Sequence, residues 1–243
     1  MRLYFIRHGQ SVNNALYDLT QNSLGRNEDP ELTDIGKKQA VCLAEFLVKA
    51  ENERSDKVDH PFDLQNRNGF GLTHLYTSPM VRAVATGTIV SEALGLPLIM
   101  WEDLHEGGGI FVEDLSGQVR TGLPGKNRIY FEIHYPRLIL PSNLNSEGWW
   151  NRPFEEEEDR LVRAQKVVRE LISRHGDTQD NVAFFSHGGF YSYFMTSLIG
   201  LTNRNNIWFS LNNAGITRID FLFGKRFITY QNRVDFLPTD LVT

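Results

Sequence analysis

Two arginines, two histidines and a glutamate in this chain could together act on a phosphate ester. Arg7 and His8 are adjacent, Arg82 lies in "TSPMVRAVAT", His187 in "FFSHGG" and Glu106 in "HEGGG". Guanidinium groups fit the oxygens of a phosphate and neutralise its charge. A neutral imidazole is a competent nucleophile toward phosphorus, and neighbouring cations keep it neutral because a like charge disfavours imidazolium. A carboxylic acid can protonate the alkoxide that leaves.

The remaining histidine and the glycines complete this chemistry without a metal. A second histidine can donate a hydrogen bond to a phosphoryl oxygen, and the glycine after each histidine lets backbone N–H groups approach an anion. Gly188 also opens an expected helix, whose N-terminus favours anions. Closely spaced His or Cys ligand pairs of the zinc type do not occur in the sequence, and arginines in the pocket would repel a cation. We therefore expect no metal and no cofactor.

These side chains need a scaffold, and the hydrophobic pattern indicates which one. Apolar runs predict strands over 2–6, 72–77, 98–101 and 182–185, and helical spacing predicts helices over 34–50, 80–93, 154–175 and 188–198. Residues 216–223 and 226–230 read as an antiparallel pair at a sheet edge. Alternating strands and helices favour an α/β fold with a mostly parallel sheet, which binds ligands at the carboxyl ends of its strands. All four polar clusters follow strands, so we expect them to converge there.

Composition limits the classes of protein that fit. The chain has 243 residues, 41% of them hydrophobic, which suits a single domain over 1–243. A net charge of −5 and a pI of about 5.8 give no global basic field for nucleic acid or an anionic membrane. Cys42 is the only cysteine, and no stretch approaches the roughly 20 apolar residues of a membrane span. We expect a soluble, cytoplasmic protein, with the N-terminal apolar run too short for a secretory signal.

The opening segment "RHGQSVNN", from Arg7 to Asn14, resembles the Arg-His-Gly-x-Ser-x-x-Asn signature of the histidine phosphatase superfamily. That group includes the cofactor-dependent phosphoglycerate mutases. "LTDIGKKQA", "TSPMVRAVAT", "SHGG" and "LNNAGITRI" resemble further elements of the family, in the family's order and over nearly the whole chain. The resemblance implies a phosphoglycerate mutase-like, three-layer α/β/α sandwich, with a mostly parallel sheet and one antiparallel edge strand.

The resemblance also implies roles for individual residues. His8 would form a phosphohistidine intermediate, and Arg7, Arg82 and His187 would complete the phosphate pocket. The positions that line this pocket and bind substrate would be Ser11, Asn14 and Gly188. The family's acid lies in a Leu-x-Glu element after the third strand, which makes Glu106 the expected proton donor. Other acids nearby leave an alternative open: Glu102, Asp103, Glu113 and Asp114.

Three functions remain possible, and a phosphatase acting on a small phosphate ester is favoured. A mutase of the family carries an arginine after the acid, whereas here Glu106 is followed by three glycines, 107–109. Arg120, Lys126 and Arg128 leave a mutase open as the alternative. A non-catalytic phosphate-binding member is the third hypothesis, although no expected catalytic residue is missing.

Residues 104–151 form an irregular insertion or lid region, which we expect to decide the substrate. Trp149 and Trp150 read either as core or as part of that lid. The aromatic residues of the segment suggest a partly apolar leaving group: Phe111, Tyr130, Phe131, Tyr135, Trp149 and Trp150.

Residues outside the proposed catalytic set receive plainer interpretations. The acidic run 155–159 reads as the solvated start of a helix. Among the other histidines, His105 is expected to line the pocket, and His74 to be a packed or hydrogen-bonded core residue within a strand. Surface or loop positions are expected for His60, His134 and His175.

Overall fold

The computed structural model describes residues 1–22, 24–52, 63–114, 116–144, 146–202 and 206–243; His60 lies outside them. The helices are α1 (Val12–Thr20), α2 (Asp34–Asn52), α3 (Val81–Leu94), α4 (Arg128–His134), α5 (Glu157–His175) and α6 (Gly188–Leu198), with short 3-10 helices η1 (Glu102–Leu104) and η2 (Thr239–Leu241). The strands are β1 (Arg2–Arg7), β2 (His74–Thr77), β3 (Leu98–Met100), β4 (Phe111–Glu113), β5 (Arg120–Gly122), β6 (Leu138–Ile139), β7 (Asn181–Ser186), β8 (Ile216–Leu222) and β9 (Lys225–Arg233).

One large sheet organises the described chain, in the strand order β6-β3-β2-β7-β1-β8-β9. The first five of these strands run parallel to one another, and β8 pairs antiparallel with both β1 and β9. The predicted mostly parallel sheet is confirmed, and so is the antiparallel pair at one edge. Because β1, β2 and β7 are neighbours and parallel, the segments that follow them emerge at the same end of the sheet.

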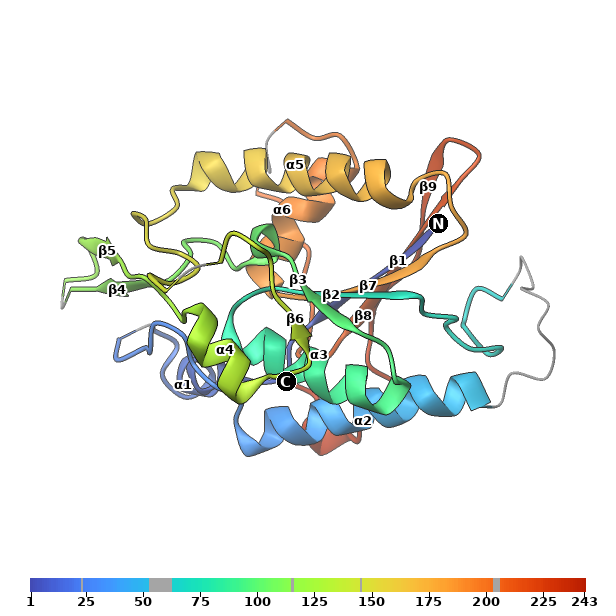
Figure 1. Ribbon diagram of the computed structural model, residues 1–243, viewed down its shortest axis with the longest axis horizontal. Helices are drawn as coiled ribbons and strands as arrows, with labels where there is room; N and C mark the ends of the chain where they lie inside the picture. The colour runs from blue at the N-terminus through green and yellow to red at the C-terminus, as the bar shows by residue number, and fades with distance from the viewer. Residues whose placement is uncertain (23, 53–62, 115, 145, 203–205) are drawn as a thin grey trace.

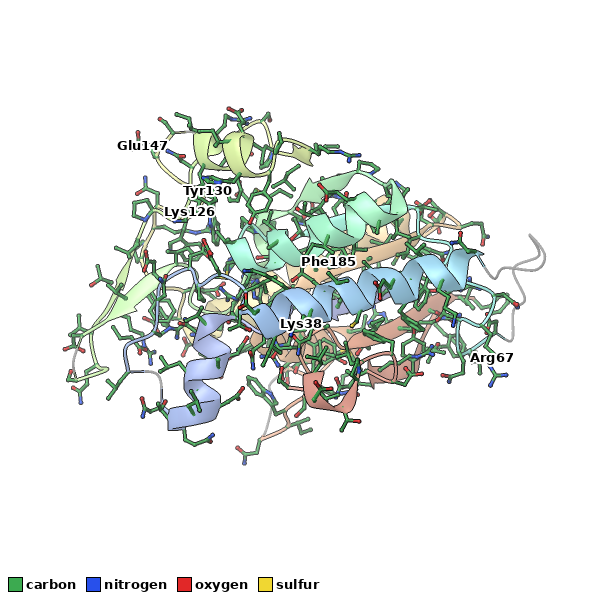
Figure 2. The ribbon with its side chains drawn as sticks, turned by 90° about the horizontal axis from the view of Figure 1, so that it is seen from below. Lys38, Arg67, Lys126, Tyr130, Glu147 and Phe185 are labelled. Carbon is green, nitrogen blue, oxygen red and sulfur yellow. The ribbon has the colours of Figure 1, made fainter. Side chains whose placement is uncertain are left out.

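Helices cover both faces of this sheet, with α5 and α6 on one side and α2 and α3 on the other (Figure 1). Side chains of β1 alternate between the faces, as a strand requires. Leu3 and Phe5 pack in the cluster that contains residues of α5 and α6, whereas Tyr4 and Ile6 pack with residues of α2 and α3. Figure 2 shows α2 and α3 lying side by side over the second face. The expected three-layer α/β/α sandwich is therefore confirmed.

A close backbone contact explains two glycines of the sequence motifs. A Cβ added to Gly9 would lie 2.4 Å from the carbonyl oxygen of Gly36, in α2, and one added to Gly36 would lie 2.0 Å from that of Gln10. Neither contact can be relieved by moving a flexible side chain. Thr33 adds to the junction by accepting the Gly36 N–H through Oγ1 at 3.0 Å, as an N-cap does. The segment after β1 is thus seated directly on the start of α2.

The region 104–151 holds more regular structure than the sequence predicts. It contains the antiparallel pair β4–β5, helix α4 and strand β6, which adds to the sheet beside β3. Trp149 and Trp150 are each only 5% exposed and belong to the hydrophobic core. Of the two readings of this pair, the core reading holds and the lid reading is wrong.

Helix α1 is a further element that the sequence analysis does not predict. None of its residues is buried, and its nine residues are fewer than the window over which helical periodicity can be recognised. Its N-terminus is defined instead by a reciprocal capping box between Ser11 and Asn14. Among the described residues, none of the helices combines the length and apolar character needed to cross a bilayer.

Candidate active site

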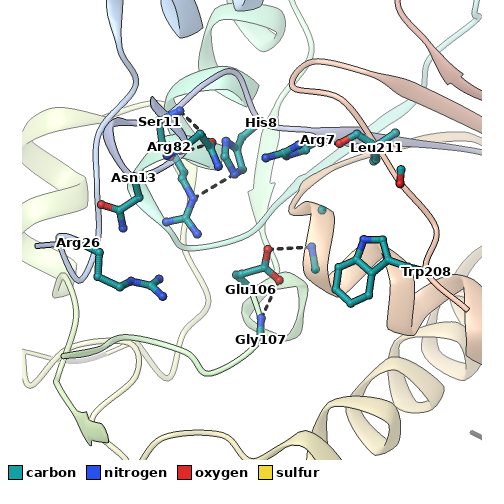
Figure 3. Close-up of a pocket in the computed structure, with 14 residues that line it drawn as sticks. Arg7, His8, Ser11, Asn13, Arg26, Arg82, Glu106, Gly107, Trp208 and Leu211 are labelled. Carbon is teal, nitrogen blue, oxygen red and sulfur yellow. Dashed lines mark hydrogen bonds between the residues drawn. The ribbon is translucent and has the colours of Figure 1, made fainter. Parts of the chain in front are cut away.

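A cavity of about 450 Å³ opens at the end of the sheet where β1 and β7 finish (Figure 3). Seven of the eight predicted site residues line it: Arg7, His8, Ser11, Asn14, Arg82, Glu106 and Gly188. The eighth, His187, is fully buried behind this surface, with its ring centroid 5.0 Å from that of His8. The predicted convergence of the four polar clusters is what the structure shows.

His8 directly follows β1 and is held as one neutral tautomer. Its Nδ1 lies 2.6 Å from the carbonyl oxygen of Gly9, which can only accept a hydrogen bond. Its Nε2 receives a hydrogen bond of 3.1 Å from Nε of Arg82, and a guanidinium can only donate. The proton therefore resides on Nδ1, and the lone pair of Nε2 faces Arg82. Burial, followed by the charges of Arg82 and Arg7, holds the pKa of His8 well below its ordinary value.

Arg82 lies in the first turn of α3 and is almost wholly buried. Its Nη1 is 3.7 Å from Oδ1 of Asp29, which is also buried and accepts the backbone N–H of Val81 at 3.1 Å. Burial lowers the pKa of Arg82 to about 10, against the opposing effect of Asp29. Burial raises the pKa of Asp29 to about 6, although Arg82 opposes that shift. Asp29 thus anchors the guanidinium from the side away from His8.

Arg7 is the last residue of β1 and supplies the second guanidinium of the site. Its Nη1 donates to the carbonyl oxygen of Leu211 at 2.7 Å, while its buried Nε has no partner among the described residues. A Cβ on Gly188 would lie 3.3 Å from that Nε, so the first residue of α6 passes close to the guanidinium. Arg7 therefore retains donors for a bound anion.

His187 follows β7 and precedes α6. Its Nε2 lies 2.8 Å from Oγ of Ser78, a hydroxyl that already accepts the backbone N–H of Met80 at 3.2 Å. The hydroxyl can donate its own proton to Nε2, and in that arrangement the ring proton lies on Nδ1. That Nδ1 is buried and has no partner in the described part of the chain. Burial and then the charge of Arg82 keep the pKa of His187 well below its ordinary value.

The carboxylate of Glu106 is seated at the N-terminus of α6. Its Oε1 accepts the N–H of Gly107 at 2.8 Å, and its Oε2 accepts that of Gly189 at 2.9 Å (Figure 3). Oε1 also accepts the N–H of Phe190 at 2.6 Å. A Cβ on Gly189 would lie 2.5 Å from Oε1, so this seat requires a glycine. The alternative acids do not line the cavity: Glu102, Asp103, Glu113 and Asp114. The geometry favours Glu106 among them.

Comparison with known proteins identifies the family. Residues 3–55 and 65–233 match the model of the histidine phosphatase superfamily (branch 1). The chain belongs to the histidine phosphatase superfamily. This confirms the resemblance seen in the sequence.

Three similar proteins share between 17% and 26% of their residues with this superfamily member. A protein of Hydrogenobacter thermophilus named "Putative phosphoserine phosphatase 2" is 26% identical over 96% of each chain. "Probable phosphoglycerate mutase GpmB" of Yersinia enterocolitica is 21% identical, covering 91% of this chain and 85% of its own. The crystal structure of a phosphoserine phosphatase mutant from Entamoeba histolytica, in complex with phosphoserine, is 17% identical with a TM-score of 0.56. That alignment covers 98% of this chain and 99% of the other, which shows the shared fold.

Polar residues behind the cavity of this superfamily member hold His8 in place. The side chain of Asn213 donates from Nδ2 to the carbonyl oxygen of His8 at 3.0 Å and to Oδ1 of Asn14 at 3.2 Å. Oδ1 of Asn14 also accepts the N–H of Ser11 at 3.1 Å. Asn213 lies in "LNNAGITRI", a segment that the sequence analysis uses for the resemblance without assigning a residue.

Apart from two glycines, five of the lining residues are absent from the predicted set: Asn13, Arg26, Trp208, Ser210 and Leu211. Asn13 lies in α1, Arg26 in the connection between α1 and α2, and the other three in the segment before β8, where hydrophobic periodicity gives no signal. None of the six aromatic residues of 104–151 that suggested an apolar leaving group lines the cavity. The apolar surface is supplied instead by Trp208, whose side chain is largely exposed.

Two histidines and one acidic residue depart from the sequence interpretation. His105 does not line the cavity: it is fully buried against Trp150, at 4.7 Å between ring centroids. His175 is buried, and its Nε2 is hydrogen-bonded to the hydroxyl of Tyr76 at 3.0 Å. His134 is exposed, as expected.

Glu155 belongs to no solvated helix start, because it is buried in an ion pair with Arg163 at 2.6 Å, before α5 begins. Arg163 also donates to the carbonyl oxygens of Asp103 at 2.7 Å and His105 at 2.9 Å, which braces the segment that carries Glu106.

One group of potential metal ligands occurs among the described residues, and it lies outside the cavity. His74, His175 and Asp180 place one ligand atom each within 4.8 Å of one another. His74 is half-buried rather than in the core, but it is hydrogen-bonded, with Nδ1 2.9 Å from Oγ1 of Thr73 and 3.8 Å from Oδ1 of Asp180. Nδ1 of His175 is 2.8 Å from Oδ2 of the same carboxylate. The polar groups of these three residues thus pair with one another, and none of the three lines the cavity.

Proposed function

We propose that this protein is a metal-independent phosphomonoesterase that hydrolyses a small phosphate ester through a phosphohistidine at His8. One observation carries the proposal: Nε2 of His8 is unprotonated and lies at the surface of a cavity that Arg7 and Arg82 also line. The family and the relatives named as phosphoserine phosphatases support this class of reaction.

In the first half of the reaction, the lone pair of Nε2 of His8 forms a bond to phosphorus. The bond from phosphorus to the ester oxygen breaks, and its electron pair passes to that oxygen, which takes a proton from the Glu106 carboxyl group. Arg7 and Arg82 neutralise the phosphoryl oxygens, and Nδ1–H of His187 is the remaining donor beside His8. Arg82 must move its Nε–H from Nε2 of His8 to a phosphoryl oxygen as substrate binds.

In the second half, water attacks phosphorus and gives a proton to the Glu106 carboxylate. The bond between phosphorus and Nε2 breaks, and its electron pair returns to the imidazole, so that inorganic phosphate leaves and the enzyme is restored. Ser11, Asn14 and the N-terminus of α6 at Gly188 would supply further hydrogen bonds to the phosphoryl group.

The three backbone hydrogen bonds to Glu106 have a consequence for this cycle. They hold the carboxyl group in one position for proton transfer to the leaving oxygen.

Trapping of the phosphoenzyme tests the proposal. Brief incubation with a ³²P-labelled ester and a denaturing quench should yield an acid-labile, alkali-stable phosphohistidine, and His8→Ala should abolish both the label and turnover. His134→Ala is the matched control, since His134 is exposed on α4 and distant in the sequence from every cavity residue. Full activity in the presence of EDTA is expected. Survival of turnover in His8→Ala, or loss of activity with the chelator, contradicts the proposal.

A further inference from the structure

Arg26 lines the cavity, yet the proposed chemistry gives it no task. It lies in the connection between α1 and α2, and Figure 3 shows its side chain pointing into the cavity from the side opposite Arg7. Its Nε is buried and has no hydrogen-bond partner in the described part of the chain. A buried donor without a partner costs free energy, which a ligand at this position would recover.

The position of Arg26 is held by the residues around it. Its guanidinium lies 4.6 Å from the centroid of the Phe111 ring on β4. The next residue, Asn27, is tied to α1, since its N–H donates to Oδ1 of Asn13 at 2.9 Å and its carbonyl accepts from Nδ2 of Asn13 at 2.7 Å. A guanidinium fixed in this way loses little conformational freedom on binding a ligand.

The charges that face Arg26 leave it available to an anion. Glu113 and Glu106 attract it and Arg120 repels it. Glu113 is engaged in an ion pair with Nε of Arg120 at 3.0 Å, and Glu106 is held by the backbone of α6.

We propose that Arg26 forms a second anion-binding subsite, and that the substrate is a phosphate monoester whose alcohol carries a carboxylate or a second phosphate. This inference rests on the proposed phosphatase function and names its substrate class. The phosphoryl group would bind at His8, Arg7 and Arg82, and the leaving alcohol would extend across the cavity so that its anionic group meets Arg26.

A matched pair of substrates tests the carboxylate. 3-Phosphoglycerate and glycerol 3-phosphate share a carbon skeleton and differ in having a carboxylate or a hydroxymethyl group away from the phosphate. We expect kcat/KM of the wild type to favour 3-phosphoglycerate by roughly 10- to 100-fold, the contribution of a charge-assisted hydrogen bond pair. Arg26→Gln should remove this preference by lowering kcat/KM for 3-phosphoglycerate while leaving that for glycerol 3-phosphate nearly unchanged.

Arg67→Gln is the control variant, because it removes the same charge from an exposed residue far from the cavity (Figure 2). It should keep the preference of the wild type. A second pair, fructose 1,6-bisphosphate and fructose 6-phosphate, distinguishes a phosphate from a carboxylate as the group that Arg26 binds. If neither pair shows a preference that Arg26→Gln abolishes, or if Arg26→Gln slows all four esters equally, the subsite does not exist.

Binding to protein without the nucleophile separates this inference from the proposed function. Calorimetry with His8→Ala should show tighter binding of 3-phosphoglycerate than of glycerol 3-phosphate, or of the bisphosphate than of the monophosphate. Addition of Arg26→Gln should remove that difference. If the wild type hydrolyses no ester, the proposed function fails, and the calorimetric comparison still decides whether Arg26 binds the second anion.

Discussion

Nε of Arg82 donates a hydrogen bond of 3.1 Å to Nε2 of His8. In the free protein, the proposed nucleophilic nitrogen is therefore hydrogen-bonded to a guanidinium that would bind the phosphate. The contact forces the reactive tautomer, because a guanidinium has no acceptor. It also makes Arg82 responsible for two tasks, orientation of His8 and neutralisation of the phosphoryl group. Both tasks predict a large effect on activity when the guanidinium is removed.

Arg82→Met should lower kcat/KM by about 10²–10³-fold or more, the usual effect of losing one transition-state donor. It should also lower the free energy of unfolding by about 3 kcal/mol, because Asp29 is left buried without its cation. Urea unfolding and initial rates measure the two effects separately.

The double variant Arg82→Met/Asp29→Asn tests the cause of that instability. It should recover most of the stability, since an amide needs no counter-charge, and none of the activity. A double variant as unstable as Arg82→Met would show that Asp29 is not the source of the loss.

The site residues at the ends of strands could be predicted from the sequence. Arg7, His8 and His187 follow strands whose apolar runs are unambiguous, and parallel pairing then brings them to one end of the sheet. Arg26 and Trp208 could not be found in this way, because they reach the cavity from connections whose paths depend on tertiary contacts such as Asn13 to Asn27.

The burial of several polar residues could not be predicted from the sequence. His175 and Glu155 carry polar groups that a pattern assigns to the surface, but specific partners, Tyr76 and Arg163, satisfy them inside the protein. Trp149 and Trp150 are flanked by glycines and polar residues, which hides their core packing from any local rule. Pairing between distant side chains decides such positions, and one sequence does not display it.

Glu106→Gln should discriminate between leaving groups. An alkoxide from glycerol 3-phosphate needs a proton, so its hydrolysis should slow by about 10²–10⁴-fold, whereas the nitrophenolate of p-nitrophenyl phosphate needs none and should slow far less. Steady-state rates on both esters provide the measurement. Glu102→Gln, which changes an acid outside the cavity, should leave both rates unchanged. Equal losses on the two esters in Glu106→Gln would exclude Glu106 as the proton donor.

Three buried histidines predict a loss of stability in mild acid. Burial keeps the pKa values of His8, His105 and His187 well below 6.5, whereas in the unfolded chain each takes up a proton near that pH. The unfolded state therefore binds more protons below pH 6.5, and stability must fall as the pH falls, by up to about 1.4 kcal/mol per pH unit for each histidine. Asp29, with its pKa raised to about 6, acts in the opposite sense below that pH and offsets part of the loss.

Urea unfolding at pH 7.5, 6.5 and 5.5 measures this slope. His105→Phe should reduce it by roughly one histidine's share, since Nε2 of His105 has no partner among the described residues and a phenyl ring can occupy the same space. An unchanged slope would mean that His105 takes up its proton in the folded protein.

Gly189→Ala should separate catalysis from stability at the seat of the acid. Alanine favours a helix over glycine by about 0.5–1 kcal/mol, so α6 itself should not be weakened. Its Cβ, however, would lie 2.5 Å from Oε1 of Glu106 and must displace the carboxylate. We expect the same selective loss on glycerol 3-phosphate as in Glu106→Gln, with little change in the free energy of unfolding.

The double variant Gly189→Ala/Glu106→Gln should be no slower than Glu106→Gln alone, because both changes act through one carboxyl group. Ser197→Ala, at the far end of α6, is the control for a change in the helix itself. Additive losses in the double variant would show that Gly189 acts on the reaction by another route, through the N–H groups that face the phosphoryl oxygens.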